Sequence, residues 1–528
     1  MQESVLLFGL LLAIIAVVLI AKRLSLPYPI AFVIGGLLLA LVPDLPAVDI
    51  QPDVIFLLVL PPLLYMGGWT TDWREFRANL RPISLLAVGL VVATTVIVAV
   101  VAHHVIPSFP WAAAFALGAI VSPPDAVAAS AIFERFPIPR RIAAVLEGEG
   151  LVNDASALVI YRFAVAAALT GAFSLTRAGA AFVAVAAGGI AVGLLVAVAI
   201  DWLLSWLEKT ASSDSLIDNV IYLVAPYAAY LPAESLHVSG VLAAVVAGIY
   251  AGRRVSGHSS PESRLTGSAV WNLLAYVMNG LVFLLIGLHL REIVHDPTFT
   301  MRAVAVGAII SVVVIAVRIA WVYPATYLPR LLFRPLSRND PAPSWRYVFI
   351  ISWAGMRGIV SLAAALALPL NDELGRPFPG RSEIIFVVFC VILATLVFQG
   401  LTLSPLIRLL GIDAGEGPER REIEVRIAAL EGALAHLTSL ERRFTTTDER
   451  LVAGRLKAEY ESRIEHLHRH LHGEQPESPV VRNDHWLQGE ALAAERSAIL
   501  RLRDAGEIPD EIFRRVQYDL DLAQARLR

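Results

Sequence analysis

The sequence predicts an all-α polytopic membrane protein of about thirteen transmembrane helices, followed by a cytosolic helical domain. Of its 528 residues, 57% are hydrophobic and only 17% are charged, which is typical of membrane proteins. Apolar stretches long enough to cross a bilayer recur as far as residue 410, and polar sequence follows them. The domains predicted are therefore a membrane domain over 1–410 and a helical tail over 411–528.

Thirteen stretches approach the length of about 20 apolar residues that a spanning helix needs. The second, third, eighth and ninth are short or interrupted, so they are expected to be tilted or partly re-entrant. The stretches are 4–21, 28–43, 53–69, 83–106, 111–134, 141–169, 178–205, 216–232, 236–251, 269–290, 301–329, 346–370 and 383–410.

Basic residues predict the orientation of these spans. One set of alternate loops holds sixteen lysine and arginine residues, among them Lys22 and Arg23, whereas the other set holds five. Because basic loops stay in the cytosol, we expect a multi-pass protein of the cell (inner) membrane with its N-terminus outside. The C-terminus is then cytosolic.

The tail begins with the polar boundary GIDAGEGPERRE and then carries an apolar stripe at helical spacing. This stripe is either a packing face within the domain or a contact with the membrane domain or a second protomer, and a regulatory role is a hypothesis. Further helices are predicted over 486–505 and from 509, with a linker over 473–479. The stripe consists of Ile423, Ile427, Leu430, Leu434 and Leu437.

Five ionisable residues fall deep in the predicted spans: Asp125, Glu149, Asp154, Arg318 and Arg357. Intramembrane charges are usually paired or line a water-filled path. If the two arginines pair with two of the acids, one acid remains without a counter-charge. The alternative interpretation, that all five only join helices, explains this imbalance poorly.

The stretch EGEGLVND (147–154) brings an amide beside one of these acids. Asn153 adds a carbonyl oxygen next to Asp154, and hard cations prefer carboxylate and carbonyl oxygens. Gly148 and Gly150 leave space for another helix or for water. The pattern indicates a site for a monovalent cation.

Two spans are predicted to be interrupted. Pro123 and Pro124 stand in mid-span just before Asp125 and cannot continue a regular helix. Gly355 and Gly358 bracket the deep arginine of the twelfth span. Interrupted spans in corresponding halves are typical of a midplane binding site in a transporter with inverted repeats.

Together these motifs resemble the monovalent cation:proton antiporter-1 family of sodium/proton exchangers, in its bacterial form, over residues 1–410. EGEGLVND matches the family's run around its transport acid, which implies that Asn153 and Asp154 are cation ligands and that Asp154 exchanges cation for proton. Pro124–Ala126 stands at the family's Thr-Asp-Pro motif, and Gly355–Gly358 at its Gly-x-Arg-Gly motif. The stretch LPPLLYMGG (60–68) matches the motif of its third helix.

The resemblance also implies how the charges are arranged. Glu149 is expected to pair with Arg318, and Asp125 to lie near Arg357. A homodimer is implied as well.

The sequence departs from the family pattern by losing ligand oxygens. Gly150 stands where serine is frequent, Pro124 and Ala126 replace threonine and proline, and Met66 stands where some members carry an acid. We therefore expect backbone carbonyls at Ser122 and Pro123, the Ser156 hydroxyl, or water to complete the cation's ligands.

The function expected is electroneutral exchange of Na⁺ (or Li⁺ or K⁺) for H⁺, in which cation and proton compete for Asp154. A K⁺-selective antiporter is the alternative, and an ion channel or an organic-anion carrier that uses Arg357 as a clamp is a further one. An enzyme is not expected, because the deep serines lack a deep histidine. Neither a cofactor nor a nucleic-acid partner is expected.

Two groups of histidines remain. His103 and His104 are either a pH sensor or an ordinary interfacial pair. In the tail, His466 with His470 and His468 with His472 are spaced to bind a transition metal or to lie on a solvated helix face.

Overall fold

The computed structural model of the chain is built from helices, and among the described residues only Asn371 and Pro377 form an isolated β-bridge. The chain divides into two compact units, Met1–Ala414 and Gly415–Arg528. The described residues are 2–42, 55–107, 109–133, 135–136, 138–171, 175–210, 215–258, 261–289, 291, 300–332, 340–371, 375–412, 417–440, 446–471, 479–505, 507 and 509–526.

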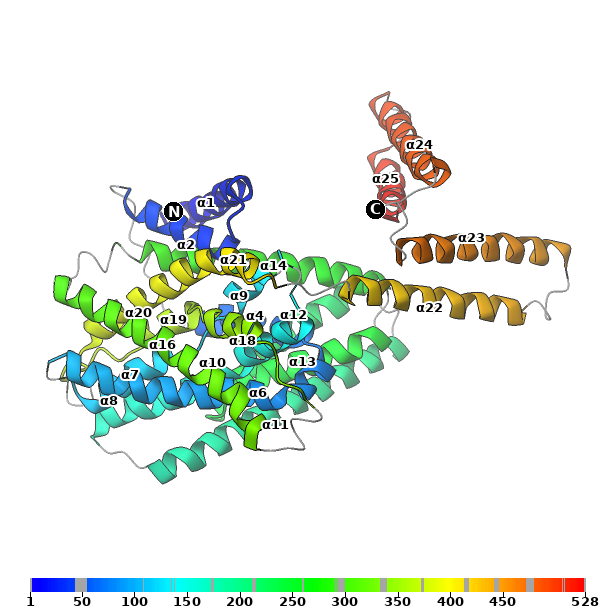
Figure 1. Ribbon diagram of the computed structural model, residues 1–528. Helices are drawn as coiled ribbons and strands as arrows, with labels where there is room; N and C mark the ends of the chain where they lie inside the picture. Colours follow the sequence, from blue (N-terminus) through cyan, green and yellow to red (C-terminus); the bar gives the residue numbers. More distant parts are fainter. Residues whose placement is uncertain are drawn as a thin grey trace. The chain divides into compact units, whose positions relative to one another are not determined.

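In the first unit, one group of helices packs through close backbone contacts: α2 runs along α14, and α4 runs along α13 (Figure 1). A Cβ atom at Gly36 would lie 2.2 Å from the carbonyl oxygen of Leu284, and one at Gly248 only 2.1 Å from that of Tyr65. Small residues thus let these helices touch, as in membrane bundles. The group comprises α1 (Gln2–Leu24), α2 (Tyr28–Ala40), the π-helical turn η1 (Ile55–Val59) leading into α4 (Leu60–Thr70), α11 (Leu175–Thr210), α12 (Ser215–Ser235), α13 (Gly240–His258) and α14 (Pro261–Leu288).

A second group of helices holds the deep charges. Its long helices α7, α10 and α16 surround two helices that are each broken in the middle. The short α5 (Trp73–Ala78) leads into the group. Its members are α6 (Leu80–Ser84), η2 (Leu85–Leu90) and α7 (Val91–Val105); α8 (Trp111–Val121) and α9 (Ala126–Phe133); α10 (Arg140–Thr170); α16 (Met301–Leu332); α18 (Trp345–Trp353) and α19 (Ile359–Leu366); and α20 (Arg381–Leu393), η3 (Ala394–Gln399) and α21 (Gly400–Leu409).

Each of the thirteen predicted stretches contains helix, and the fifth and twelfth are divided into two helices as predicted. Among the described residues, eight helices are long and apolar enough to cross a membrane, with two shorter apolar helices over 28–40 and 55–70. The total of thirteen crossings therefore stays a prediction.

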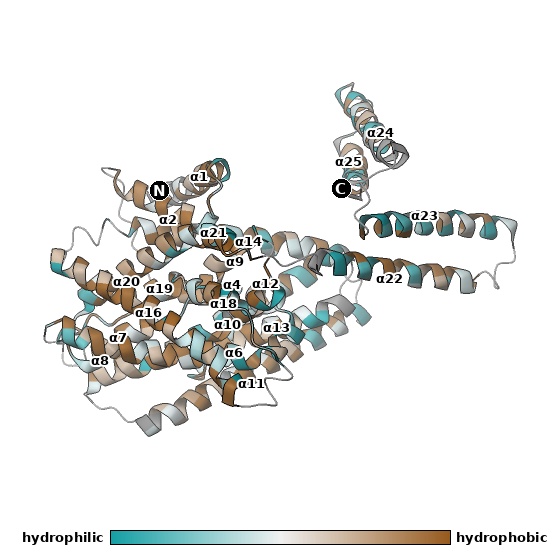
Figure 2. Cartoon of the chain, in the orientation of Figure 1, coloured by the Kyte–Doolittle hydropathy of each residue, from teal (hydrophilic) through white to brown (hydrophobic). Residues whose placement is uncertain are grey.

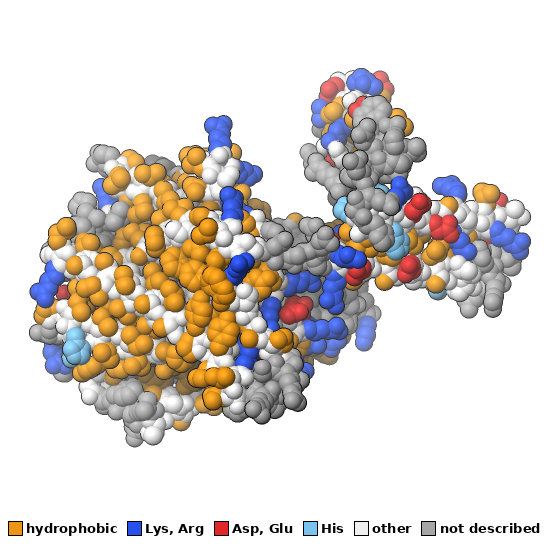
Figure 3. All heavy atoms as spheres, viewed as in Figure 1, with side chains coloured by type: hydrophobic (Ala, Val, Ile, Leu, Met, Phe, Trp, Pro, Cys, Tyr) orange, Lys and Arg blue, Asp and Glu red, His pale blue; other side chains and the backbone are white. Residues whose placement is uncertain are grey.

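The surface of the first unit suits a lipid environment. Its helices are predominantly hydrophobic (Figure 2), and hydrophobic side chains cover much of the face seen in Figure 3. Leu195 and Trp202 of α11, for example, are 71% and 68% exposed. Exposed apolar surface of this extent marks a membrane-embedded protein.

The second unit consists of two helical pairs, α22 (Gly417–Leu440) with α23 (Thr447–Leu471) and α24 (Pro479–Asp504) with α25 (Asp510–Arg526). All five residues of the predicted stripe on α22 are at least partly buried, and Ile427 is only 5% exposed. Part of the stripe's packing therefore lies within this unit. Of the predicted linker, 473–478 lie outside the described residues. The cytosolic location and regulatory role of this unit stay predictions.

Candidate functional site

The first helix break lies between α8 and α9. Pro123 and Pro124 offer no N–H groups, so the carbonyls at the end of α8 lack their usual helical partners. Other elements supply donors: Ser361 Oγ donates to the Ile120 carbonyl at 2.7 Å, and Arg357 Nε donates to the Val121 carbonyl at 3.0 Å. The break is thus held by side chains from the second broken helix.

The second break, between α18 and α19, is stabilised in the same way. Arg318 on α16 donates to the carbonyl of Ile351 from Nε at 3.3 Å and from Nη2 at 3.1 Å. A Cβ atom at Gly355 would lie 2.2 Å from Arg318 Cδ, so only glycine leaves room for this arginine. A positive charge at the C-terminal end of a half-helix is favourable because that end carries a partial negative charge.

The two breaks touch each other. The backbone N–H of Asp125 donates to the Met356 carbonyl at 2.6 Å. Asp125 Oδ1 accepts from the Val127 N–H at 2.9 Å, and a Cβ atom at Gly358 would lie 1.8 Å from Asp125 Oδ2. The carboxylate of Asp125 therefore lies at the N-terminal ends of both α9 and α19, where helix dipoles favour negative charge.

Glu149 and Arg318 form the ion pair that the family resemblance implied. Arg318 Nη1 donates to Glu149 Oε1 at 2.5 Å and Nη2 to Oε2 at 2.8 Å, with the side chains 0% and 1% exposed. This bidentate geometry is the strongest that arginine and a carboxylate form.

Among the five deep charges, no second pair of an acid with an arginine forms, contrary to the count of charges made from the sequence. Arg357 lies close to Asp125 along the backbone. Its guanidinium, however, donates to the carbonyls of Val121, Ser122 and Gly355, and its N–H donates to Thr395 Oγ1 at 3.0 Å. Arg357 thus replaces the lost helical partners of α8 instead of neutralising an acid.

Asn153 and Asp154 on α10 face this crossing. Asn153 Nδ2 donates to the Pro124 carbonyl at 2.8 Å, whereas its Oδ1 is buried and lacks a hydrogen-bond partner among the described residues. Asp154 is half-buried and makes no hydrogen bond or ion pair with a described residue. A cation would engage both the unused amide oxygen and the uncompensated carboxylate.

The space beside Gly150, expected to hold another helix or water, is filled by helix α9. A Cβ atom there would lie 2.3 Å from Ala126 Cβ, and one at Gly148 would lie 2.4 Å from Ile83 Cδ1. Both glycines therefore serve helix packing, and a side chain at position 150 would collide with the first residue of α9.

The other oxygens expected to bind the cation differ in their availability. The Ser122 carbonyl accepts from Arg357 Nη2 at 3.4 Å, and Ser122 Oγ donates to the Ala119 carbonyl. Ser156 Oγ donates to the Val152 carbonyl at 3.3 Å. The carbonyl of Pro123 makes no hydrogen bond with a described residue. The unoccupied oxygens are therefore carboxylate, amide and peptide oxygens, which suit a hard monovalent cation.

The last span contributes two polar residues that were not among the predicted site residues. Thr395 receives the Arg357 N–H, and the amide nitrogen and oxygen of Gln399 are buried without a partner among the described residues. Both belong to η3, and π-helical turns are frequent at functional sites. The signal was available, because two polar residues four apart interrupt an apolar span.

The described histidines offer little evidence for a pH sensor or a metal site. His103 Nδ1 lies 2.6 Å from the Phe109 carbonyl with its ring stacked on Trp111, and His104 Nδ1 lies 2.7 Å from the Val100 carbonyl. These local contacts suit ordinary interfacial residues. His472 lies outside the described residues, and no group of three metal-ligating side chains occurs among those described.

Comparisons with known proteins agree on one family. The model of the family described as "Sodium/hydrogen exchanger, transmembrane" matches residues 9–409. The "Uncharacterized Na(+)/H(+) exchanger YjcE" of Escherichia coli is 33% identical over 99% of this chain and 98% of its own length. The "Sodium, potassium, lithium and rubidium/H(+) antiporter" of Bacillus subtilis is 32% identical over 95% of this chain and 75% of its own.

A solved structure supports the fold. The sodium proton antiporter MjNhaP1 of Methanocaldococcus jannaschii superposes with a TM-score of 0.57 at 18% identity, covering 78% of this chain and all of that one. With the broken helices in contact and the family model matching residues 9–409, this chain belongs to the sodium/hydrogen exchanger family.

Proposed function

We propose that this protein exchanges Na⁺, or another monovalent cation, for H⁺, and that Asp154 binds either the cation or the proton but never both. One observation carries the proposal. The buried Asn153 oxygen and the Asp154 carboxylate both lack a partner among the described residues, and they belong to neighbouring residues beside the contact of the two broken helices. Half-helix ends of this kind form cation sites in transporters.

Competition for a single acid explains obligatory exchange. An empty, charged carboxylate crosses the apolar barrier at a cost of at least a few kcal/mol, so only the loaded forms of the carrier change sides readily. The proton-loaded and the cation-loaded site carry the same net charge. We therefore expect one-for-one, electroneutral exchange driven by the proton gradient.

Of the other deep charges, Glu149, Arg318 and Arg357 are assigned to holding the helices around the site in place. Glu149 with Arg318 fixes α10 to α16, and Arg357 holds the end of α8. Asp125 and Asn153 stand beside Asp154 as its partners in cation binding. Because Arg357 is 0% exposed and engaged on carbonyls, it is poorly placed to clamp an organic anion.

Transport by purified protein in liposomes tests the proposal. Asp154→Asn is expected to lose cation-dependent proton flux, whereas Glu208→Gln, at an exposed acid of α11, is expected to retain it. Na⁺/H⁺ exchange is expected to carry no net current, and its rate is expected not to change with an imposed membrane potential. Full flux in Asp154→Asn, or a current that ignores the proton gradient, would overturn the assignment and favour a channel.

Cation preference is a separate question. The Bacillus subtilis relative is named for four cations, and few oxygens remain free at this site, so we propose broad use of Na⁺, Li⁺ and K⁺. Offering each cation alone in the same liposomes decides between this and K⁺ selectivity.

We also propose a cell (inner) membrane location with the N-terminus outside and the C-terminus in the cytosol, and assembly as a homodimer. Labelling of cysteines placed singly at the two termini in intact cells, in a Cys390→Ser background, tests the orientation. The mass of the detergent-solubilised protein tests the dimer.

A further inference from the structure

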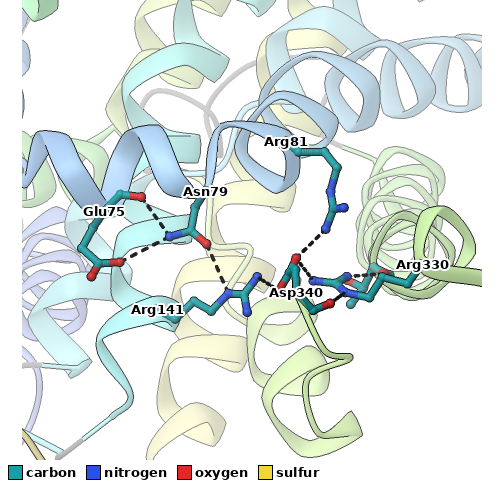
Figure 4. A network of polar contacts seen from close by, with 7 residues as sticks. Glu75, Asn79, Arg81, Arg141, Arg330 and Asp340 are labelled. Carbon is teal, nitrogen blue, oxygen red and sulfur yellow. Dashed lines mark hydrogen bonds and ion pairs between the residues drawn. The ribbon is translucent and has the colours of Figure 1, made fainter. Parts of the chain in front are cut away.

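A second polar cluster lies apart from the transport site. Asp340, just before α18, accepts from Arg81 at 2.9 Å, from Arg141 at 2.7 Å and from Arg330 at 2.7 Å (Figure 4). The three arginines come from α6, α10 and α16. Three guanidinium groups thus share the carboxylate of Asp340. A second acid, Glu75, joins the cluster only through Asn79, so the arginines outnumber the acids.

These arginines line a cavity of about 420 Å³ between α6, α10, α16 and α18. None of the described residues that line it is acidic, and Asp340 itself is not part of the lining. The rest of the wall is mostly apolar, with Leu86, Val145 and Val322 among its residues. The cavity therefore combines an anion-attracting rim with a hydrophobic interior.

Two of the three nitrogen atoms of the Arg81 guanidinium make no hydrogen bond with a described residue. Its Nη2 reaches Asp340, but its Nε and Nη1 are buried and without a hydrogen-bond partner among the described residues. A buried donor left without a hydrogen bond is unfavourable, and more so on a charged group. Arg81 and Arg141 remain 30% and 42% exposed as side chains, so a ligand can reach the cluster from the surface.

We propose that this cavity binds the phosphate of an acidic phospholipid, with the phosphate on Arg81 and Arg141 and an acyl chain along the apolar wall. Free phosphate offers the same charged group, but the apolar wall favours a lipid. The cluster lies on the side of the membrane that the basic loops predict to be cytosolic. Basic pockets between helices on that side are typical sites for acidic lipid head groups.

Binding by the delipidated full-length protein in detergent tests this directly. The probes are short-chain phosphatidylglycerol, short-chain phosphatidylcholine and inorganic phosphate, and the readout is the shift of the thermal unfolding midpoint across a titration. Phosphatidylglycerol is expected to stabilise the protein more than the other two. Equal stabilisation by phosphatidylcholine overturns the site, and equal stabilisation by inorganic phosphate overturns its assignment to lipid.

Matched variants locate the effect. Arg81→Gln and Arg141→Gln are each expected to weaken phosphatidylglycerol binding about five- to tenfold, since one arginine near a lipid surface contributes about 1 kcal/mol. Arg77→Gln, at an exposed arginine of α5 outside the cavity, is expected to leave binding unchanged. Identical binding by the Arg77 and Arg81 variants contradicts the proposal.

Asp340→Asn separates a lipid site from a purely structural cluster. Removing the competing carboxylate frees donors on all three arginines, so this variant is expected to bind phosphatidylglycerol more tightly while its unliganded form is less stable. A purely structural cluster predicts loss of stability without any gain in affinity. Weaker lipid binding by Asp340→Asn would therefore refute the proposal even if the arginine variants are unstable.

Discussion

The buried pair of Glu149 and Arg318 allows a quantitative prediction. In Glu149→Gln, the guanidinium keeps its hydrogen bonds to the Ile351 carbonyl, but it loses the negative charge of its partner and one of its two acceptor oxygens becomes an NH₂ group, while it remains 0% exposed. Breaking a buried pair by removing one partner destabilises a protein by about 3–5 kcal/mol, because the remaining charge stays buried. We expect a loss of this size in Glu149→Gln.

The double variant Glu149→Leu with Arg318→Met is expected to be more stable than Glu149→Gln alone. It removes both charges, so the unpaired buried charge disappears. What remains is the Ile351 carbonyl without its donors, a deficit of about 1–3 kcal/mol. If the two residues stabilised the protein independently, their losses would add, and the double variant would be less stable than Glu149→Gln. A charge-compensating pair predicts the opposite order.

The assay is the fraction of monodisperse protein that survives heating in detergent, measured for both variants, for wild type and for Glu208→Gln as a neutral control. The expected order is wild type and control, then the double variant, then Glu149→Gln. If the double variant melts below Glu149→Gln, the pair is not a charge-compensating unit and the reasoning fails.

Three further predictions concern packing, pH and the site. Gly150→Ser is expected to impair folding or transport because its Cβ would lie 2.3 Å from Ala126 Cβ, and a second change, Ala126→Gly, should restore much of the loss; no restoration would contradict the steric account. Although burial raises the pKa of Asp340, the hydrogen bond from Arg141 and the charges of the three arginines outweigh it and hold that pKa below its ordinary value. This contribution to stability is present above the ordinary aspartate pKa and is lost as the pH falls through the lowered one, so acid should narrow the difference in melting temperature between wild type and Asp340→Asn, and a constant difference would exclude it. Asn153→Ala is expected to raise the KM for Na⁺ in liposome transport, and an unchanged KM would remove Asn153 from the ligands.

The sequence was sufficient where structure depends on local chemistry. Pro123 and Pro124 cannot continue a helix wherever they lie, and the break after Val121 follows from their missing N–H groups. The pairing of Glu149 with Arg318 followed only from the family resemblance, because the two residues are 169 positions apart and no local rule joins them.

The sequence was insufficient where backbone atoms act as partners. Counting charges assigned Arg357 to an acid, but the broken helix creates free carbonyls at Val121 and Ser122 that no list of ionisable residues contains. For Gly150 the sequence left two occupants open, another helix or water, and the contact with Ala126 shows that the occupant is a helix.

The contacts at the crossing account for each deep charge except one. Arg357 is compensated by carbonyls at the end of α8, and Glu149 by Arg318. Asp125 lies at the N-terminal ends of two half-helices, whose combined partial charges approach one positive charge. Asp154 is half-buried and has no such compensation among the described residues. A carboxylate in this position gains most from a mobile positive charge, and a proton and a monovalent cation are the two that can neutralise it equally.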